Sequence, residues 1–136
     1  MAGCGGYSLP MEHALEVRHD GTLIFWSDGK WLHPLFDLAA FLAASPLASG
    51  ELRLRDKIVG RAAALLAVHL GIGHVHADVL SRHGQAVLMQ FGVAHTYDTL
   101  VDRIACRTED LLLNDTDPAD AFTMLAERAR RVAAAP

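Results

Sequence analysis

The residues best suited to chemistry stand in one short run, which contains Asp56, Lys57, Gly60 and Arg61. The apolar residues that follow predict a helix over 56–70, with Asp56 as its N-cap. Backbone N–H groups at a helix start bind anions, Lys57 and Arg61 could hold a phosphate, and Gly60 permits close approach of a ligand. We therefore expect a nucleotide-like or phosphate-bearing ligand at these four residues. The alternative is that Asp56 only caps the helix while Lys57 stays solvated.

A second polar pattern follows in the predicted strand from His74 to Leu80. His74, His76 and Asp78 alternate along it, so their side chains share one face. A His-x-His pair on a strand could bind a divalent metal, but ordinary packing is the simpler interpretation, and we expect no metal and no cofactor. Asp78 and Ser81 are expected to join the ligand site, because ligands of open α/β sheets gather beyond the carboxyl ends of strands.

Cys106 and Glu109 form a third candidate pair and are also placed among the ligand-binding residues. A carboxylate raises the pKa of a neighbouring thiol and does not activate it, so catalysis here would need another base, such as His95. The simpler interpretation is that Cys106 is a small packed residue. Whether the protein is an enzyme stays open at this point.

The elements that must position these residues alternate between strand and helix patterns. Asp20-Gly21 predicts a hairpin turn, and Asp117 or Asp115 is expected to begin the last helix, with Pro118 in its first turn. The expected order is strands over 14–19 and 22–26, helices over 34–44 and 56–70, a strand over 74–80, a helix over 83–91, a strand over 94–98 and the terminal helix. This order predicts an α/β fold: a three-layer α/β/α sandwich with a mixed sheet and helices on both faces.

Composition limits the classes of function. The chain has 136 residues, of which 51% are hydrophobic, and suits a single domain over 14–132 after a flexible arm at 1–13. Its net charge of -4 argues against nucleic acid as a partner. No apolar run reaches the ~18 residues of a membrane span, so we expect no membrane partner. The two cysteines form no disulfide framework or CxxC pair, which favours the cytoplasm.

The run from Asp56 to Leu66 resembles the D-K-x-V-G-[KR]-A-A-A-L-L signature of an uncharacterised prokaryotic family, domain of unknown function 1893. Further matches over residues 15–127 keep the same order: Asp20-Gly21 with Leu23-Ile24-Phe25, Pro34-Leu35, Val75-x-Ala77-x-Val79-x-Ser81, Tyr97-Asp98-x-Leu100-Val101 and Asp117-Pro118-x-Asp120-Ala121. The resemblance implies a cytidine-deaminase-like fold.

This sequence departs from that pattern before the last helix. Relatives carry Asn-Arg-Asp-Gly and then Cys-Pro-x-Glu, whereas only Cys106 and Glu109 remain here. Zinc deaminases need His-x-Glu at one helix start and a Cys pair at the next. Neither the start at Asp56 nor the start at Ser81 carries them, so deamination is not expected.

Three functions are therefore carried forward. The first is a deaminase-like domain without zinc that binds a small molecule, such as a nucleotide. The second is an enzyme of unassigned reaction that uses Lys57, Cys106 or Glu109. The third is a non-catalytic regulatory homo-oligomer, with a homodimer as its simplest form.

Overall fold

The computed structural model describes residues 12–29, 32–45, 47–102, 104 and 117–134. Cys106 and Glu109, and nearly all of the expected arm at 1–13, lie outside the described residues. The elements are β1 (Leu15–His19), β2 (Thr22–Ser27), α1 (His33–Ala43), a 3-10 helix η1 (Ser49–Glu51), β3 (Arg53–Val59), α2 (Arg61–His69), β4 (His74–Ser81), α3 (Arg82–Gln90), β5 (Ala94–Val101) and α5 (Pro118–Ala134). Among the described residues, no helix combines the length and the apolar character needed to cross a membrane.

The five strands form one mixed sheet in the order β2-β1-β3-β4-β5. β1 runs antiparallel to both β2 and β3, whereas β3, β4 and β5 are parallel. The hairpin between β1 and β2 turns at Asp20 and Gly21, whose φ angles of 51° and 81° lie in the left-handed region. The Asp-Gly pair supplies residues that tolerate this conformation, so the predicted hairpin is confirmed.

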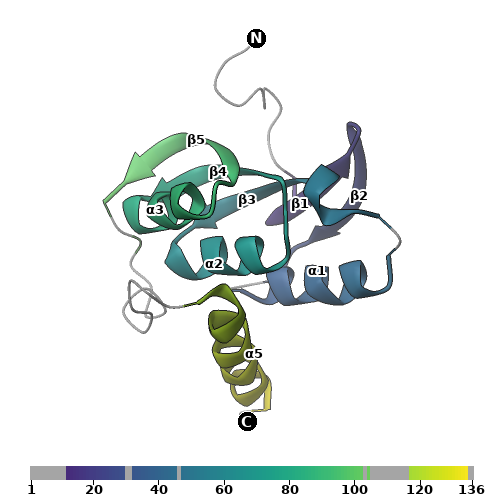
Figure 1. The fold of residues 1–136 in the computed structure, drawn as a ribbon. Coiled ribbons are helices and arrows are strands. Elements are labelled where there is room, and N and C mark those ends of the chain that lie inside the picture. The colour runs from purple at the N-terminus through teal and green to yellow at the C-terminus, as the bar shows by residue number, and fades with distance from the viewer. Residues whose placement is uncertain (1–11, 30–31, 46, 103, 105–116, 135–136) are drawn as a thin grey trace.

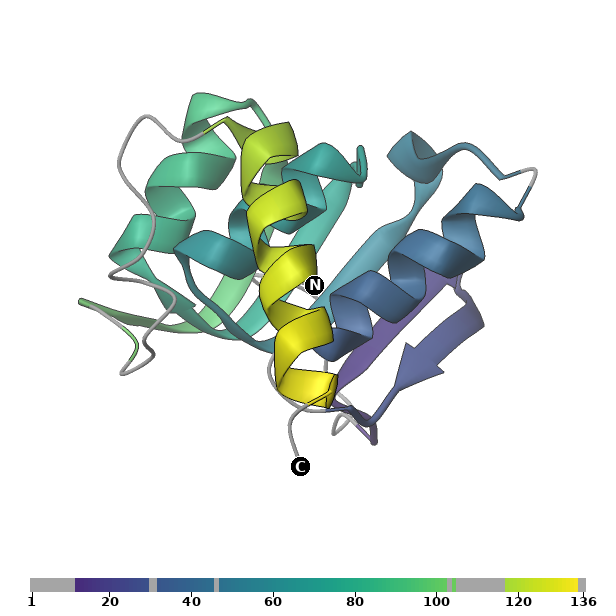
Figure 2. The same ribbon diagram turned by 90° about the horizontal axis from the view of Figure 1, so that it is seen from below.

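The helices of the described residues lie on one side of the sheet (Figures 1 and 2). α1, α2 and α3 form a layer against it, and α5 packs on the outer side of α2, so the layers follow in the order sheet, helices, helix. The predicted α/β fold with a mixed sheet is confirmed, whereas the expected helices on both faces are not found among the described residues. The connections from β2 to β3, β3 to β4 and β4 to β5 all advance in the same direction across the sheet. Because such connections are right-handed, they place α1, α2 and α3 on the same face.

The predicted helix over 56–70 is wrong in its first third. Residues 53–59 form β3, which pairs with β1 on one side and with β4 on the other. Leu54 is buried between Val17 and Val75, its register partners on those two strands. The helix begins only at Arg61, after an extended N-cap at Gly60. Pairing on both sides and burial of Leu54 therefore outweigh the helical pattern of this segment.

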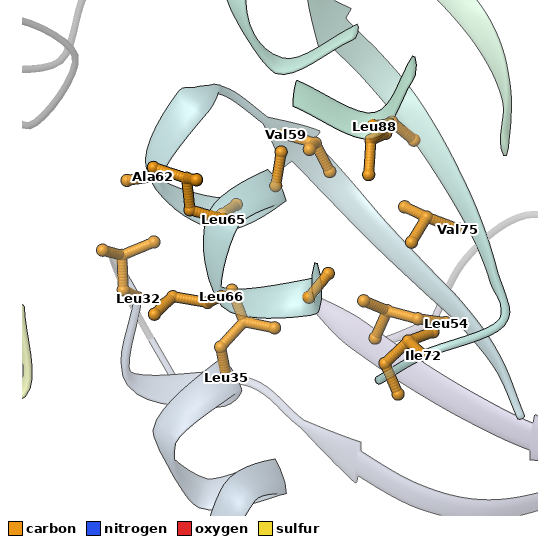
Figure 3. Packing of buried hydrophobic residues seen from close by; sticks show 14 of the residues in the cluster. Leu32, Leu35, Leu54, Val59, Ala62, Leu65, Leu66, Ile72, Val75 and Leu88 are labelled. Atoms are coloured by element: carbon orange, nitrogen blue, oxygen red, sulfur yellow. The ribbon is translucent and has the colours of Figure 1, made fainter. Parts of the chain in front are cut away.

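The hydrophobic core lies between the sheet and the helix layer (Figure 3). α2 is its centre, because every residue from Arg61 to Ala67 is buried. Its four alanines leave room for close approach, and α3, α5 and β3 all contact it. The expectation that this helix is buried on more than one side is confirmed. Because α2 begins at Arg61, its packing in the core places Arg61 at the edge of the sheet.

Candidate functional site

Two helices begin side by side at one edge of the sheet. β3 and β4 are parallel, and α2 and α3 follow almost directly after their carboxyl ends. A Cβ added to Gly84 would lie 3.0 Å from the carbonyl oxygens of both Gly60 and Val59. The first turn of α3 therefore rests against the backbone that leads into α2.

Basic side chains occupy these two helix starts. Arg61, the first residue of α2, is buried, and a guanidinium nitrogen lies 3.1 Å from Nδ1 of His83. Arginine has only donors, so His83 accepts at Nδ1 and carries its proton at Nε2. Arg82, the first residue of α3, donates from Nε to Asp102 Oδ1 at 2.9 Å. The first turns, residues 61–64 and 82–85, contain no acidic side chain.

Ser81 lies at the same edge but has a structural task. Its side chain is buried, and Oγ accepts a hydrogen bond of 2.9 Å from the backbone N–H of Gly84. This contact makes Ser81 the N-cap of α3. Of the residues predicted to bind the ligand, Gly60, Arg61 and Ser81 thus come together.

Asp56 and Lys57 lie inside β3, before the helix begins. The interpretation of Asp56 as a helix N-cap is wrong, because Gly60 takes that position. Burial raises the pKa of the Asp56 carboxyl to about 7, against hydrogen bonds from the backbone N–H groups of Ile58 and Lys57 that lower it. Lys57 is exposed.

Asp78 belongs to a second group of polar side chains, on the opposite face of the sheet. Val75 and Ala77 point into the core, so the alternate residues His76 and Asp78 point away from the helices. Asp78 Oδ1 accepts from Arg55 Nε at 3.1 Å. The structure therefore separates Asp78 from Arg61 and Ser81, with which it was predicted to act.

His76 is fully buried in this second group. Its Nε2 atom lies 3.3 Å from Oδ1 of Asp98, on β5, and 3.9 Å from Oδ1 of Asp78. Its Nδ1 atom lies 2.7 Å from Oγ1 of Thr96, which is also 3.3 Å from Nε2 of His74. His74, His76 and Asp78 were predicted to share a face of the sheet. This is confirmed, because His74 and His76 both contact Thr96, and His76 lies beside Asp78. Asp98 was missed, because it joins them only through the pairing of β4 with β5.

Comparison with known families adds an assignment. A family profile described as "Domain of unknown function (DUF1893)" matches residues 12–128. The chain belongs to the DUF1893 family. A crystal structure of a DUF1893 family protein from Thermotoga maritima resembles this DUF1893 chain with a TM-score of 0.74 and 24% sequence identity, over 85% of this chain and 80% of that one. That likeness supports the fold alone. No curated protein matches the chain.

Proposed function

We propose that this DUF1893 protein binds a phosphate-bearing small molecule, of the nucleotide type, where α2 and α3 begin. The observation that carries the proposal is the contact between Arg61 and His83 at two adjacent helix starts. A helix N-terminus carries a partial positive charge, and a basic residue placed there is normally unfavourable. Both helices begin with arginine, and because Arg82 is paired with Asp102, a bound anion would relieve repulsion chiefly at Arg61 as well as gain hydrogen bonds.

The position in the fold supports the same proposal. Parallel strands deliver their carboxyl ends to one edge, which is where ligands of open α/β sheets bind. The scaffold is cytidine-deaminase-like in this proposal, but the zinc chemistry of deaminases is not part of it. The helix starts read Gly60-Arg61-Ala62 and Ser81-Arg82-His83, without a His-x-Glu or a Cys pair. An arginine contributes to anion binding rather than to activation of water.

The enzyme alternative has less support. Lys57 is exposed, and no described contact pairs it with a catalytic partner, while Cys106 and Glu109 lie outside the described residues. The oligomer alternative is tested by measuring the molar mass in solution with and without ADP. A mass above that of one chain would support it.

The test measures binding of ADP, inorganic phosphate and adenosine by isothermal titration calorimetry. ADP and phosphate are expected to compete for one site, and adenosine, which lacks phosphate, is expected not to bind. His83→Gln changes an exposed residue and is expected to weaken ADP binding roughly tenfold, the effect of losing one charge-assisted contact. Arg61→Gln is expected to weaken it further.

Arg53→Gln is the matched control, because Arg53 is an exposed arginine at the opposite end of β3 from Gly60. Its affinity for ADP should equal that of the wild type. The proposal fails if neither ADP nor phosphate binds the wild-type protein at millimolar concentration. It also fails if Arg53→Gln weakens binding as much as Arg61→Gln does, because that result indicates non-specific attraction.

A further inference from the structure

The polar face of the sheet brings three potential metal ligands together. One donor atom each from His76, Asp78 and Asp98 can be chosen so that all lie within 4.8 Å of one another. The group depends on strand register: β4 and β5 are parallel, with His76 opposite Thr96, so Asp78 and Asp98 fall next to each other. The sequence alone led to the expectation of no metal, and the register changes that expectation.

The distances are close to those around a bound ion. Ligand atoms about 2.1 Å from a tetrahedral zinc ion are about 3.4 Å apart. The separation between His76 Nε2 and Asp98 Oδ1 is 3.3 Å, and that between His76 Nε2 and Asp78 Oδ1 is 3.9 Å. All three atoms lie within 4.8 Å of one another, so the Asp78 carboxylate must move closer before the three can bind one ion.

The surroundings orient these ligands in the way that metal sites require. When His76 donates from Nδ1 to Thr96 Oγ1 at 2.7 Å, its Nε2 lone pair faces the two carboxylates. Thr96 can then donate its own hydroxyl hydrogen to His74 Nε2, 3.3 Å away. Arg55 holds Asp78 through Nε at 3.1 Å. Such outer contacts fix the orientation of metal-binding side chains and adjust their basicity.

The charges and the exposure of the group also suit a cation. Two neighbouring carboxylates repel each other, and a divalent ion between them removes that repulsion. The side chain of His76 is 0% exposed, that of Asp78 28% and that of Asp98 54%. The group is therefore closed on the imidazole side and open to water beside Asp98. Three protein ligands with an open side are typical of zinc sites that also bind water or a substrate.

We propose that His76, Asp78 and Asp98 bind a divalent transition-metal ion, with Zn²⁺ favoured over Mn²⁺. One imidazole with two carboxylates suits both ions, and the general order of affinities places zinc above manganese. The competing arrangement has no metal, and His76 donates from Nε2 to Asp98 instead. The site lies on the other face of the sheet from Arg61, so it stands or fails independently of the phosphate site.

The test uses the full chain without a histidine tag, after treatment with EDTA and dialysis. Titration with ZnCl₂, followed by calorimetry, is expected to show one equivalent bound tightly, and MnCl₂ is expected to bind more weakly. Asp98→Asn alters a half-exposed side chain without changing its size, and should weaken zinc binding at least about tenfold. Asp102→Asn is the matched control, since Asp102 directly follows β5 and is 93% exposed.

A second measurement uses only the wild-type protein, so its result does not depend on whether a variant folds. Long-range ¹H–¹⁵N spectra of wild-type imidazoles are expected to show the Nε2 resonance of His76 move as zinc is added. The proposal is overturned if the wild type binds no zinc, or if Asp98→Asn binds it as tightly as the wild type. It is also overturned if other imidazoles move while His76 retains a proton on Nε2, because zinc is then bound elsewhere.

Discussion

Gly73 lies so close to Gly50 that a Cβ added to Gly73 would stand 2.0 Å from the Gly50 carbonyl oxygen. The contact joins the segment before β4 to η1. Backbone atoms form both sides of it, so neither side can rotate away. Glycine is needed at position 73 for space and not for an unusual φ.

Gly73→Ala is accordingly expected to lower the free energy of unfolding by about 2 kcal/mol, the typical cost of forcing a methyl group into a packed region. Gly50→Ala is the matched control, because its added Cβ would meet no atom closer than 4.0 Å. Urea denaturation of both variants measures the difference. Equal stability of the two would show that this contact is not formed in solution.

Asp56 is expected to make the protein less stable as the pH rises. Burial raises the pKa of its carboxyl from 3.8 to about 7, so between those values the folded protein holds a proton that the unfolded chain has lost. Stability from this group is therefore present at low pH and is lost as the pH rises towards 7.

Asp56→Asn removes the titration while keeping the shape and an oxygen that accepts hydrogen bonds. We expect this variant to be more stable than the wild type by about 2 kcal/mol at pH 8, since partial exposure reduces the full effect of the shift. At pH 4 the two proteins should differ little. Thermal unfolding across this range checks the prediction, and an equal stability gain at both pH values contradicts it.

Ser81→Ala is expected to lower stability by about 1 kcal/mol, because the variant loses the bond that caps α3. Its affinity for ADP should match that of the wild type, since the hydroxyl of Ser81 is engaged with Gly84. Chemical denaturation and calorimetry measure the two effects. A large loss of ADP affinity would show that Ser81 contacts the ligand, as the sequence first predicted.

Leu125 holds α5 against the rest of the protein and is fully buried. Leu125→Ala should cost about 3 kcal/mol, the usual penalty for a cavity in a core. Met124→Ala changes the neighbouring residue, which is 43% exposed, and should cost less than about 0.5 kcal/mol. Equal losses, measured by urea denaturation, would contradict the packing of α5 on α2.

Thr96→Val removes the hydroxyl that links His74 and His76 without changing the size of the side chain. The lost hydrogen bonds should cost about 1 kcal/mol, and zinc binding should weaken roughly tenfold through poorer orientation of His76. Thr99→Val is the control on the same strand, because Thr99 is exposed. Identical zinc affinity in both variants would show that Thr96 does not orient His76.

Local signals predicted much of the fold. Asp20-Gly21 supplied the left-handed residues of the hairpin, and Asp117 accepts hydrogen bonds from Ala119 and Asp120 at the start of α5, as its position suggested. β3 was missed because the apolar run after Lys57 continues into α2, and a buried strand and a buried helix have similar compositions. The alternation over residues 52–55 and the N-cap at Gly60 are the signals that separate them.

The candidate sites were less predictable because they depend on long-range placement. Arg61 was identified from its position in the chain, but its contact with His83 requires two helix starts to lie together. Asp98 contributes through the register between β4 and β5, which the residues of neither strand specify alone. The separation of Asp78 from Ser81 had a local signal that the predicted site overlooked: the two residues are three apart, and side chains alternate between the faces of a strand.

The placement of all described helices on one side of the sheet has a consequence for how such a protein can change. Apolar core residues of the sheet, such as Leu54 and Val75, face α2 (Figure 3). Substitutions at His76 or Asp98 alter the opposite side and leave the packing between layers untouched. Evolution can therefore exchange the chemistry of that side while the architecture persists, and proteins that share this architecture need not share a ligand.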